Sequence, residues 1–359
     1  MFRNPMKKIL FSATALVAVV SLVLAGCGDD NDSEGADSSD KPLIVVTTNI
    51  LGDVVTNMVG DSFDVETIMP PGSDPHDFQA SAQQVQMMMS ADLLIVNGAN
   101  FEEGMLDVIE NAESDGVMIF EATSVISQLE GSDDHSDHGE HDDHDDHEGH
   151  DDHDEEKDHD DHEGHGHDEE KDHDDHEGHD HGGIDPHFFT DPARMAIVAQ
   201  ELSEVLAANF PDADQGFVST ANDYVQQLQD LDSEVEETLS VISSDKRLLV
   251  TNHGVFAYFA DRYSFTILGE IIPSSSTLAS ASAQQLASLA EEIKESQVKA
   301  IFADASSSDA LAQTLADEVN DVKVINLYTE SLGDPGSSGD SYIDMIRFNA
   351  EAIASALVE

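Results

Sequence analysis

Short apolar runs alternate along the chain with stretches whose apolar residues recur every three or four positions. Eight runs rich in β-branched residues predict buried strands at residues 43–48, 65–68, 93–96, 117–120, 248–251, 265–268, 300–303 and 322–327. Helical spacing predicts helices at residues 54–59, 82–90, 283–296 and 309–319. Strands that alternate with helices favour parallel sheets with helices on both faces.

A longer helical pattern separates the two groups of strands. Apolar residues between 214 and 243 recur at mostly three- and four-residue steps, which predicts a helix on the order of 45 Å long. We therefore expect an α/β fold of two lobes, each with a parallel-type sheet, joined by one long rigid helix. The predicted boundaries are 42–213 for the N-terminal lobe, 214–244 for the linking helix and 245–359 for the C-terminal lobe. A surface helix of a single domain is the alternative.

The N-terminus has the pattern of an export signal. Arg3, Lys7 and Lys8 precede an apolar run at residues 9–24, and small residues follow at 25 and 26. Residues 1–26 therefore predict a secretory signal and an extracytoplasmic location. A transmembrane anchor is the alternative, for which the run is short and no second apolar span follows.

Cys27 is the only cysteine of the chain, which excludes a disulfide framework or a cysteine-based metal site within one chain. Leu24, Ala25, Gly26 and Cys27 resemble the lipobox of bacterial lipoproteins. That resemblance implies cleavage before Cys27 and a lipid anchor on its sulfur, whereas a chance cysteine is the alternative. Residues 27–41, rich in Asp, Ser and Gly, are then a flexible tether to the membrane.

The composition favours cations as ligands. With 76 acidic and 14 basic residues the formal net charge is −62, so the chain would repel a nucleic acid, and we expect none as a partner. Without the acidic residues and lysines of residues 131–183, the charge is still −38. Adaptation to a saline habitat and a merely acidic surface explain this equally well.

Residues 131–183 form a low-complexity tract with 15 His and 26 Asp or Glu, in which residues 155–165 recur identically at 169–179. No apolar side chain there could build a core, so the tract is predicted to be disordered without metal. Its imidazoles and carboxylates predict several weak zinc sites, and a solvated insertion without a metal role is the alternative. The histidines are His135, His138, His141, His144, His147, His150, His153, His159, His162, His165, His167, His173, His176, His179 and His181.

Only three histidines lie outside the tract, namely His76, His187 and His253. His76 and His187 each end an Asp-Pro-His triplet, in which proline restrains the backbone that presents the imidazole. His253 lies between the strand predicted at 248–251 and a helix start predicted at residues 252–260, and the carboxyl ends of strands are where α/β sheets place ligands. A surface, packed or helix-capping histidine is the alternative for each taken singly.

Three neutral imidazoles and one carboxylate or water would complete a tetrahedral zinc site. We expect Asp304, which ends a predicted strand, to be the fourth ligand; Asp309 or a water are the alternatives. Asp74 and Asp185 each precede a histidine by two residues and could orient its imidazole, although an Asx turn explains them as well.

Five stretches together resemble the cluster A-I solute-binding proteins of ABC importers, which include zinc-binding ZnuA-like and manganese-binding TroA/PsaA-like members. They are residues 47–52, 71–76, 91–98, 185–187 with 191–192, and 253–259. The resemblance implies two lobes joined by one long helix, with metal in the cleft between them. His76 and His187 would come from the N-terminal lobe, and His253 and Asp304 from the C-terminal lobe.

The resemblance also implies the function of a high-affinity zinc importer component that delivers Zn²⁺ to an ABC permease and its ATPase. The third histidine is often Glu in manganese members, so His253 favours zinc over Mn²⁺. Many zinc members carry a His-rich loop immediately before the second histidine, as here. The alternatives are a manganese importer component and a surface zinc buffer or adhesin. A zinc hydrolase is disfavoured because no His-Glu-x-x-His motif occurs. A monomer is the default expectation.

Overall fold

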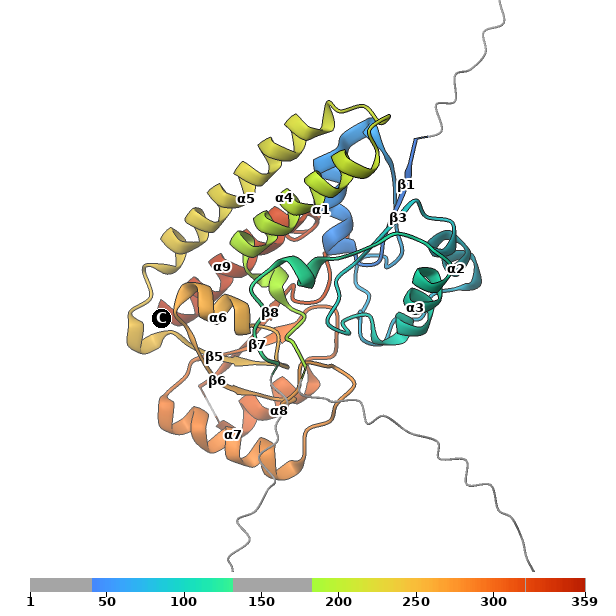
Figure 1. Cartoon of the computed structure of the whole chain (residues 1–359). Coiled ribbons are helices and arrows are strands. Elements are labelled where there is room, and N and C mark those ends of the chain that lie inside the picture. The colour runs from blue at the N-terminus through green and yellow to red at the C-terminus, as the bar shows by residue number, and fades with distance from the viewer. Residues whose placement is uncertain (1–40, 132–182, 320, 359) are drawn as a thin grey trace, which may run out of the picture. The chain divides into compact units, whose positions relative to one another are not determined.

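The eight predicted strands form two parallel four-stranded sheets in a computed structural model, which describes residues 41–131, 183–319 and 321–358 (Figure 1). The first sheet has the order β2-β1-β3-β4 and the second β6-β5-β7-β8. The strands are β1 (Leu43–Val46), β2 (Asp64–Thr67), β3 (Leu93–Val96), β4 (Ile119–Glu121), β5 (Leu248–Thr251), β6 (Thr266–Glu270), β7 (Ala300–Asp304) and β8 (Lys323–Leu327). The expected α/β fold with a parallel sheet in each half is confirmed.

The first strand ends two residues earlier than predicted because its threonines serve the next helix. Thr48 is the N-cap of α1 (Asn49–Val59), and its side-chain oxygen accepts a hydrogen bond from the backbone N–H of Leu51 at 3.3 Å. Thr48, although β-branched, therefore caps a helix and is not part of the strand. This turn brings Asn49 to the carboxyl end of β1.

Three further helices lie close to their predicted positions, namely α2 (Ala82–Met89), α7 (Ala283–Ser296) and α8 (Ala310–Val319). The helices α3 (Leu106–Ser114), α4 (Pro192–Asn209) and α9 (Tyr342–Val358) were not predicted, whereas the expected helix after His253 is α6 (Ala257–Tyr263). Two neighbouring residues of the sequence account for the start of α4. Asp191 caps it by accepting from the N–H of Ala193 at 2.8 Å, and Pro192 occupies the first helical position.

The long helix α5 spans Phe217–Leu239. Its 23 residues reach about 35 Å, shorter than the predicted length. It begins late because the carboxylate of Asp214 accepts a hydrogen bond from the N–H of Gly216 at 3.0 Å, which forms an Asx turn in place of a helical start. The helix then leads into the second sheet.

One apolar core extends from the first sheet to the second. Helices α1, α4 and α9 pack against α5, and Figure 1 shows these helices grouped together. The core includes Ile44 of β1, Leu228 of α5, Leu249 of β5 and Ile353 of α9, none of which is exposed. The two halves are therefore joined by continuous packing as well as by α5, and residues 41–359 form one compact unit.

Each sheet also has a smaller core on its other face. Side chains alternate between the faces of a strand, so Val45 and Leu94 pack beneath α2 and α3, whereas Val250 and Ile301 pack beneath α7 and α8. Each sheet thus lies between helical layers on both faces.

Several predictions fall outside the described residues. They concern the signal at 1–26, Cys27 with its tether, and the histidines of the tract. No helix in the described part of the chain is both long and apolar enough to cross a membrane. The lobe boundaries at 213 and 245 also stay predictions.

The shared core predicts that both halves unfold together. Leu228→Ala should create a cavity at the centre of this core and lower the free energy of unfolding by about 2–5 kcal/mol. Calorimetry of the metal-free protein should show a single transition that moves to lower temperature. The exposed Gln229→Ala is the control and should leave the transition nearly unchanged. Two separate transitions, of which Leu228→Ala moves only one, would contradict a core common to both halves.

Candidate metal site

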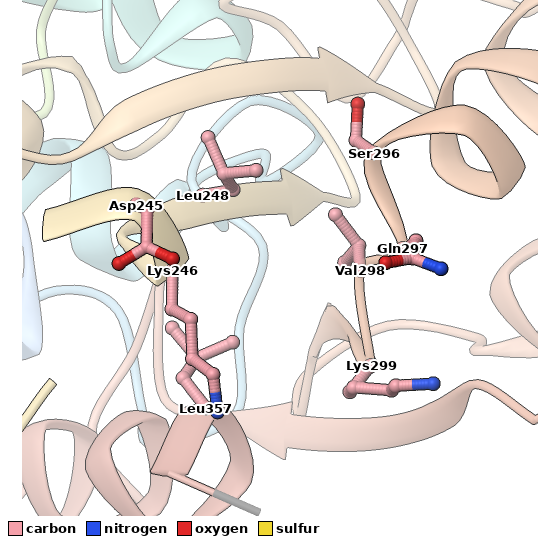
Figure 2. Close-up of a pocket in the computed structure, with 8 residues that line it drawn as sticks. All are labelled: Asp245, Lys246, Leu248, Ser296, Gln297, Val298, Lys299 and Leu357. Carbon is pink, nitrogen blue, oxygen red and sulfur yellow. The ribbon is translucent and has the colours of Figure 1, made fainter. Parts of the chain in front are cut away.

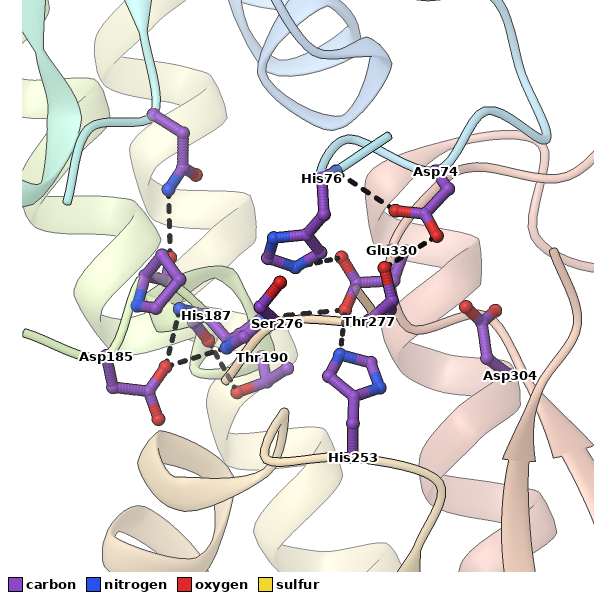
Figure 3. Close-up of polar contacts among 12 residues, drawn as sticks. Asp74, His76, Asp185, His187, Thr190, His253, Ser276, Thr277, Asp304 and Glu330 are labelled. Carbon is purple, nitrogen blue, oxygen red and sulfur yellow. Dashed lines mark hydrogen bonds and ion pairs between the residues drawn. The ribbon is translucent and has the colours of Figure 1, made fainter. Parts of the chain in front are cut away.

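Four side chains from four loops converge on one point between the two sheets (Figure 3). His76 lies between β2 and α2, and His187 lies just before α4. His253 follows β5, and Glu330 follows β8. Three of these loops leave the carboxyl ends of parallel strands, the edge at which α/β sheets bind ligands. The structure therefore brings the three predicted histidines together and adds a glutamate.

The carboxylate of Glu330 lies at the centre of the group. Its Oε1 is 2.7 Å from Nε2 of His253 and 3.3 Å from Nε2 of His187. Its Oε2 is 3.6 Å from Nε2 of His76. One ligand atom from each residue lies within 4.8 Å of all the others, and all four side chains are at most 2% exposed. The arrangement matches the three-nitrogen, one-oxygen donor set of a tetrahedral metal site.

Carboxylates orient two of the imidazoles. Nδ1 of His187 lies 2.8 Å from Oδ1 of Asp185, and Nδ1 of His76 lies 2.9 Å from Oε1 of Glu103. An ionised carboxylate can only accept hydrogen bonds, so each Nδ1 carries the proton. In the neutral form of each imidazole, Nε2 then has the lone pair that a metal needs, and neither Nε2 has a hydrogen-bond partner among the described residues. Such carboxylate–histidine pairs are the usual support of a metal ligand.

Asp185 and Asp74 differ in the groups that donate hydrogen bonds to their carboxylates. Oδ1 of Asp185 accepts from the backbone N–H of His187 at 2.8 Å and also from its ring. This one oxygen therefore both closes the Asx turn and orients the imidazole. Among the described residues, the carboxylate of Asp74 accepts from the backbone N–H of His76, at 3.0 Å, and from the hydroxyl of Thr277, at 2.8 Å. For Asp74 the structure therefore has the Asx turn in place of a contact with the ring. Glu103, which does contact the ring of His76, was not predicted.

The expected fourth ligand, Asp304, lies outside the group. Its two carboxylate oxygens accept hydrogen bonds from the backbone N–H and the hydroxyl of Ser306, at 2.8 and 2.7 Å. Burial and the nearby Glu330 carboxylate raise the pKa of Asp304 to about 6. Glu330 replaces it in the group, and the exposed Asp309 precedes α8. We therefore correct the fourth position from Asp304 to Glu330.

The charges in the group are strongly coupled. Burial opposes ionisation of Glu330, but the His187 and His253 imidazoles hold its pKa well below the usual value of a glutamate. Burial likewise opposes a charged imidazole at His187, but the Glu330 and Asp185 carboxylates raise its pKa to about 10. The raised pKa of His187 shows that the carboxylates around this imidazole favour positive charge there. A divalent cation satisfies the same carboxylates.

A separate cavity of about 290 Å³ lies at the opposite edge of the second sheet (Figure 2). Its lining includes Lys246 and Lys299 next to the amino ends of β5 and β7. Nζ of Lys246 lies 3.5 Å from the carbonyl oxygen of Val358 at the end of α9. A cation stabilises the negative end of a helix dipole, which accounts for this lysine without a ligand. The cavity contains none of the predicted site residues.

Two parallel sheets of identical strand order, with three imidazoles and a carboxylate buried between them, define an α/β metal-binding protein of the two-lobe type. Residues 44–356 match the family model described as ZnuA, zinc-uptake complex component A, periplasmic. The chain therefore belongs to the ZnuA family.

Known relatives match nearly the full length of the chain. The manganese ABC transporter substrate-binding lipoprotein PsaA of Streptococcus anginosus is 26% identical over 360 residues, covering 98% of this chain and 99% of the relative. The manganese-binding lipoprotein MntA of Halalkalibacterium halodurans is 24% identical, with 98% and 99% covered. These lipoprotein names confirm the predicted extracytoplasmic, membrane-anchored location. The lipid on Cys27 itself stays a prediction.

Solved structures confirm the fold. The periplasmic zinc-binding protein TroA from Treponema pallidum superimposes with a TM-score of 0.68 at 24% identity, covering 88% of this chain and 99% of TroA. A manganese-bound periplasmic metal-binding protein from Candidatus Liberibacter asiaticus also gives 0.68, at 20% identity, with 88% and 100% covered. At these identities the likeness concerns the fold alone.

The position of Glu330 can be tested against that of Asp304. Glu330→Gln keeps the size of the side chain but removes the only carboxylate of the group, so metal affinity should fall by about a hundredfold or more. Asp304→Asn should change it by less than about threefold, because Asp304 bonds to its own loop and lies outside the group. Competition with a strong chelator measures both. A larger loss in Asp304→Asn than in Glu330→Gln would restore Asp304 as the fourth ligand.

Proposed function

We propose that this protein captures Zn²⁺ outside the cytoplasm and delivers it to an ABC permease and its ATPase. Membership of the ZnuA family makes the chain the substrate-binding component of a metal ABC transporter. The single observation that carries the zinc assignment is the donor set. Three imidazole nitrogens and one carboxylate oxygen within 4.8 Å suit zinc in tetrahedral geometry.

Manganese is the second candidate because several relatives are named as manganese-binding proteins. Mn²⁺ prefers oxygen donors, and only one of the four residues here supplies oxygen. A simple comparison of affinities cannot decide between the two metals, since almost any site of this kind binds Zn²⁺ more tightly than Mn²⁺. The decision needs a measurement of which metal the cell takes up through this protein.

The shared core limits how the ion can leave the site. Wide hinge opening would break the packing that joins α5 to both sheets, so small local movements are the expected route. We expect the ion to leave by movement of the serine-rich loop at residues 273–281, which forms one wall of the site. Thr277 joins this loop to the other half through its hydrogen bond to Asp74. Glu103, with 32% of its side chain exposed, connects His76 to solvent.

The His-rich tract would supply the buried site with zinc through weak, exchangeable sites. Its two ends meet next to the site, where Glu130 and Ile184 form an antiparallel bridge and the N–H of Gly131 donates to the carbonyl of Gly183 at 2.8 Å. Ile184 is only three residues from His187. Metal concentrated by the tract would therefore be released beside a ligand of the proposed site.

Two other functions have less support. A zinc hydrolase would need a general base beside an open metal position, and the ZnuA family consists of solute-binding proteins. A zinc buffer or adhesin without a transporter would not depend on a permease. Both alternatives predict that zinc uptake by cells is independent of this protein.

Uptake of radioactive zinc and manganese by cells that lack the native protein tests the proposal. Complementation with the full chain should restore zinc uptake, and the His76→Ala, His187→Ala, His253→Ala triple variant should not, because it lacks three of four ligands. Deletion of residues 132–182 should slow uptake only when zinc is scarce. Restored uptake of manganese but not zinc would favour the manganese function, and an active triple variant would exclude the proposed site.

A further inference from the structure

Asn49 makes hydrogen bonds to loops from both halves of the molecule. It is the first residue of α1, at the carboxyl end of β1, and is 7% exposed. Its Nδ2 donates to the carbonyl of Pro70 at 3.0 Å and to the hydroxyl oxygen of Ser331 at 2.7 Å. Its Oδ1 accepts from the backbone N–H of Leu332 at 2.8 Å. One carboxamide therefore uses both its donor and its acceptor to join two segments about 260 residues apart.

Each of these segments carries a residue of the proposed site. Pro70 begins the loop that leads to His76, and Ser331 directly follows Glu330. A second contact joins the same segments, because the N–H of Gly72 donates to Ser331 Oγ at 2.8 Å. The carboxylate of Glu330 approaches His253 of its own half to 2.7 Å, but His76 of the other half only to 3.6 Å. The placement of Glu330 against His76 therefore depends on how the two loops are held together.

We propose that Asn49 is a positioning residue for metal binding, which holds the Glu330 loop against the His76 loop. This inference rests on the proposed function of the same four ligands. The side-chain hydrogen bonds of Asn49 go to none of the four side chains, so it would act through Pro70, Ser331 and Leu332. Without its carboxamide the buried N–H of Leu332 would lack its acceptor, and the loop would gain freedom to move away from His76. The metal would then have to restore that order on binding, at the expense of affinity.

Asn349 offers a matched control. It is 6% exposed, and its carboxamide also bonds in both directions, accepting from the N–H of Tyr328 at 3.0 Å and donating to its carbonyl at 2.7 Å. Tyr328 begins the same loop as Glu330, but Asn349 lies on α9, and both of these side-chain hydrogen bonds go to Tyr328 and not to the His76 loop. Asn49→Ala and Asn349→Ala thus remove similar bonds from one loop. Of the two changes, only Asn49→Ala removes hydrogen bonds that join this loop to the other half.

The test measures zinc affinity of the full chain in detergent by competition with a chelator strong enough to empty the tract. Asn49→Ala should raise the Kd about tenfold, and Ser331→Ala about threefold. Combining the two should raise the Kd by less than the product of the single changes, because both remove the hydrogen bond between Asn49 and Ser331. Asn349→Ala should lower the melting temperature of the metal-free protein about as much as Asn49→Ala, while its Kd stays within about twofold of the unchanged protein.

Equal losses of affinity in Asn49→Ala and Asn349→Ala would overturn the inference, since general order of the loop would then explain both. An unchanged Kd in Asn49→Ala would also overturn it. If Asn49→Ala does not fold, an unchanged Kd in Ser331→Ala decides against the inference in the same way. The triple histidine variant distinguishes failure of the proposed metal site from failure of the proposed role of Asn49. Tight zinc binding that survives in that variant would refute the proposed site itself, whereas loss there with retention in Asn49→Ala refutes only the role of Asn49.

Discussion

The contact of one buried carboxylate with three buried imidazoles is the constraint on which the rest of the structure depends. A charge removed from water is tolerated only when it is paired and hydrogen-bonded. Glu330 meets this requirement because His76, His187 and His253 surround it at 2.7 to 3.6 Å. Outer carboxylates from Asp185 and Glu103 then orient two of the rings. The result is a negatively biased centre in which three imidazoles and one carboxylate bring a ligand atom each to within 4.8 Å of the others, which is what capture of a divalent cation requires.

The fold makes this arrangement stiff. The two sheets would form separate lobes if α5 alone joined them, but α1, α4 and α9 fill the space beside α5 and extend one core through both. Close-packed cores resist large relative movements of the parts that they join. Ligand-bearing loops from the two halves are fixed at one end by this core and near the site by direct hydrogen bonds. Small displacements of a loop, in place of wide opening, are therefore the motion that fits this structure.

The sequence allowed much of this to be predicted, for reasons that are visible in particular residues. The runs 93–96 and 248–251 consist of apolar residues apart from Thr251 because parallel strands are covered on both faces, so their positions were predicted to the residue. The three histidines stood out because no other histidine lies outside the tract. Strand ends were less certain, since Thr47 and Thr48 suit a strand as well as a helix start.

The fourth ligand could not be predicted because nothing local distinguishes Glu330. Asp304 ends β7 and Glu330 follows β8, so both lie at the carboxyl edge of the second sheet, and the chain has 76 acidic residues. Asp304 is turned to its own loop by Ser306, whereas Glu330 is directed to the histidines by a loop anchored on Asn49. Both effects arise from contacts that form only on folding. The same reason explains why Glu103 was missed, since its partner His76 is 27 residues away.

The most direct measurement of the central claim is zinc X-ray absorption spectroscopy, together with a crystal structure of the zinc-loaded protein. We expect one buried Zn²⁺ with three nitrogen ligands at about 2.0–2.1 Å and one oxygen of Glu330 at about 2.0–2.2 Å. The nitrogens should be Nε2 of His76, His187 and His253. Coordination by Asp304, or a six-coordinate shell dominated by oxygen, would exclude the proposed zinc site.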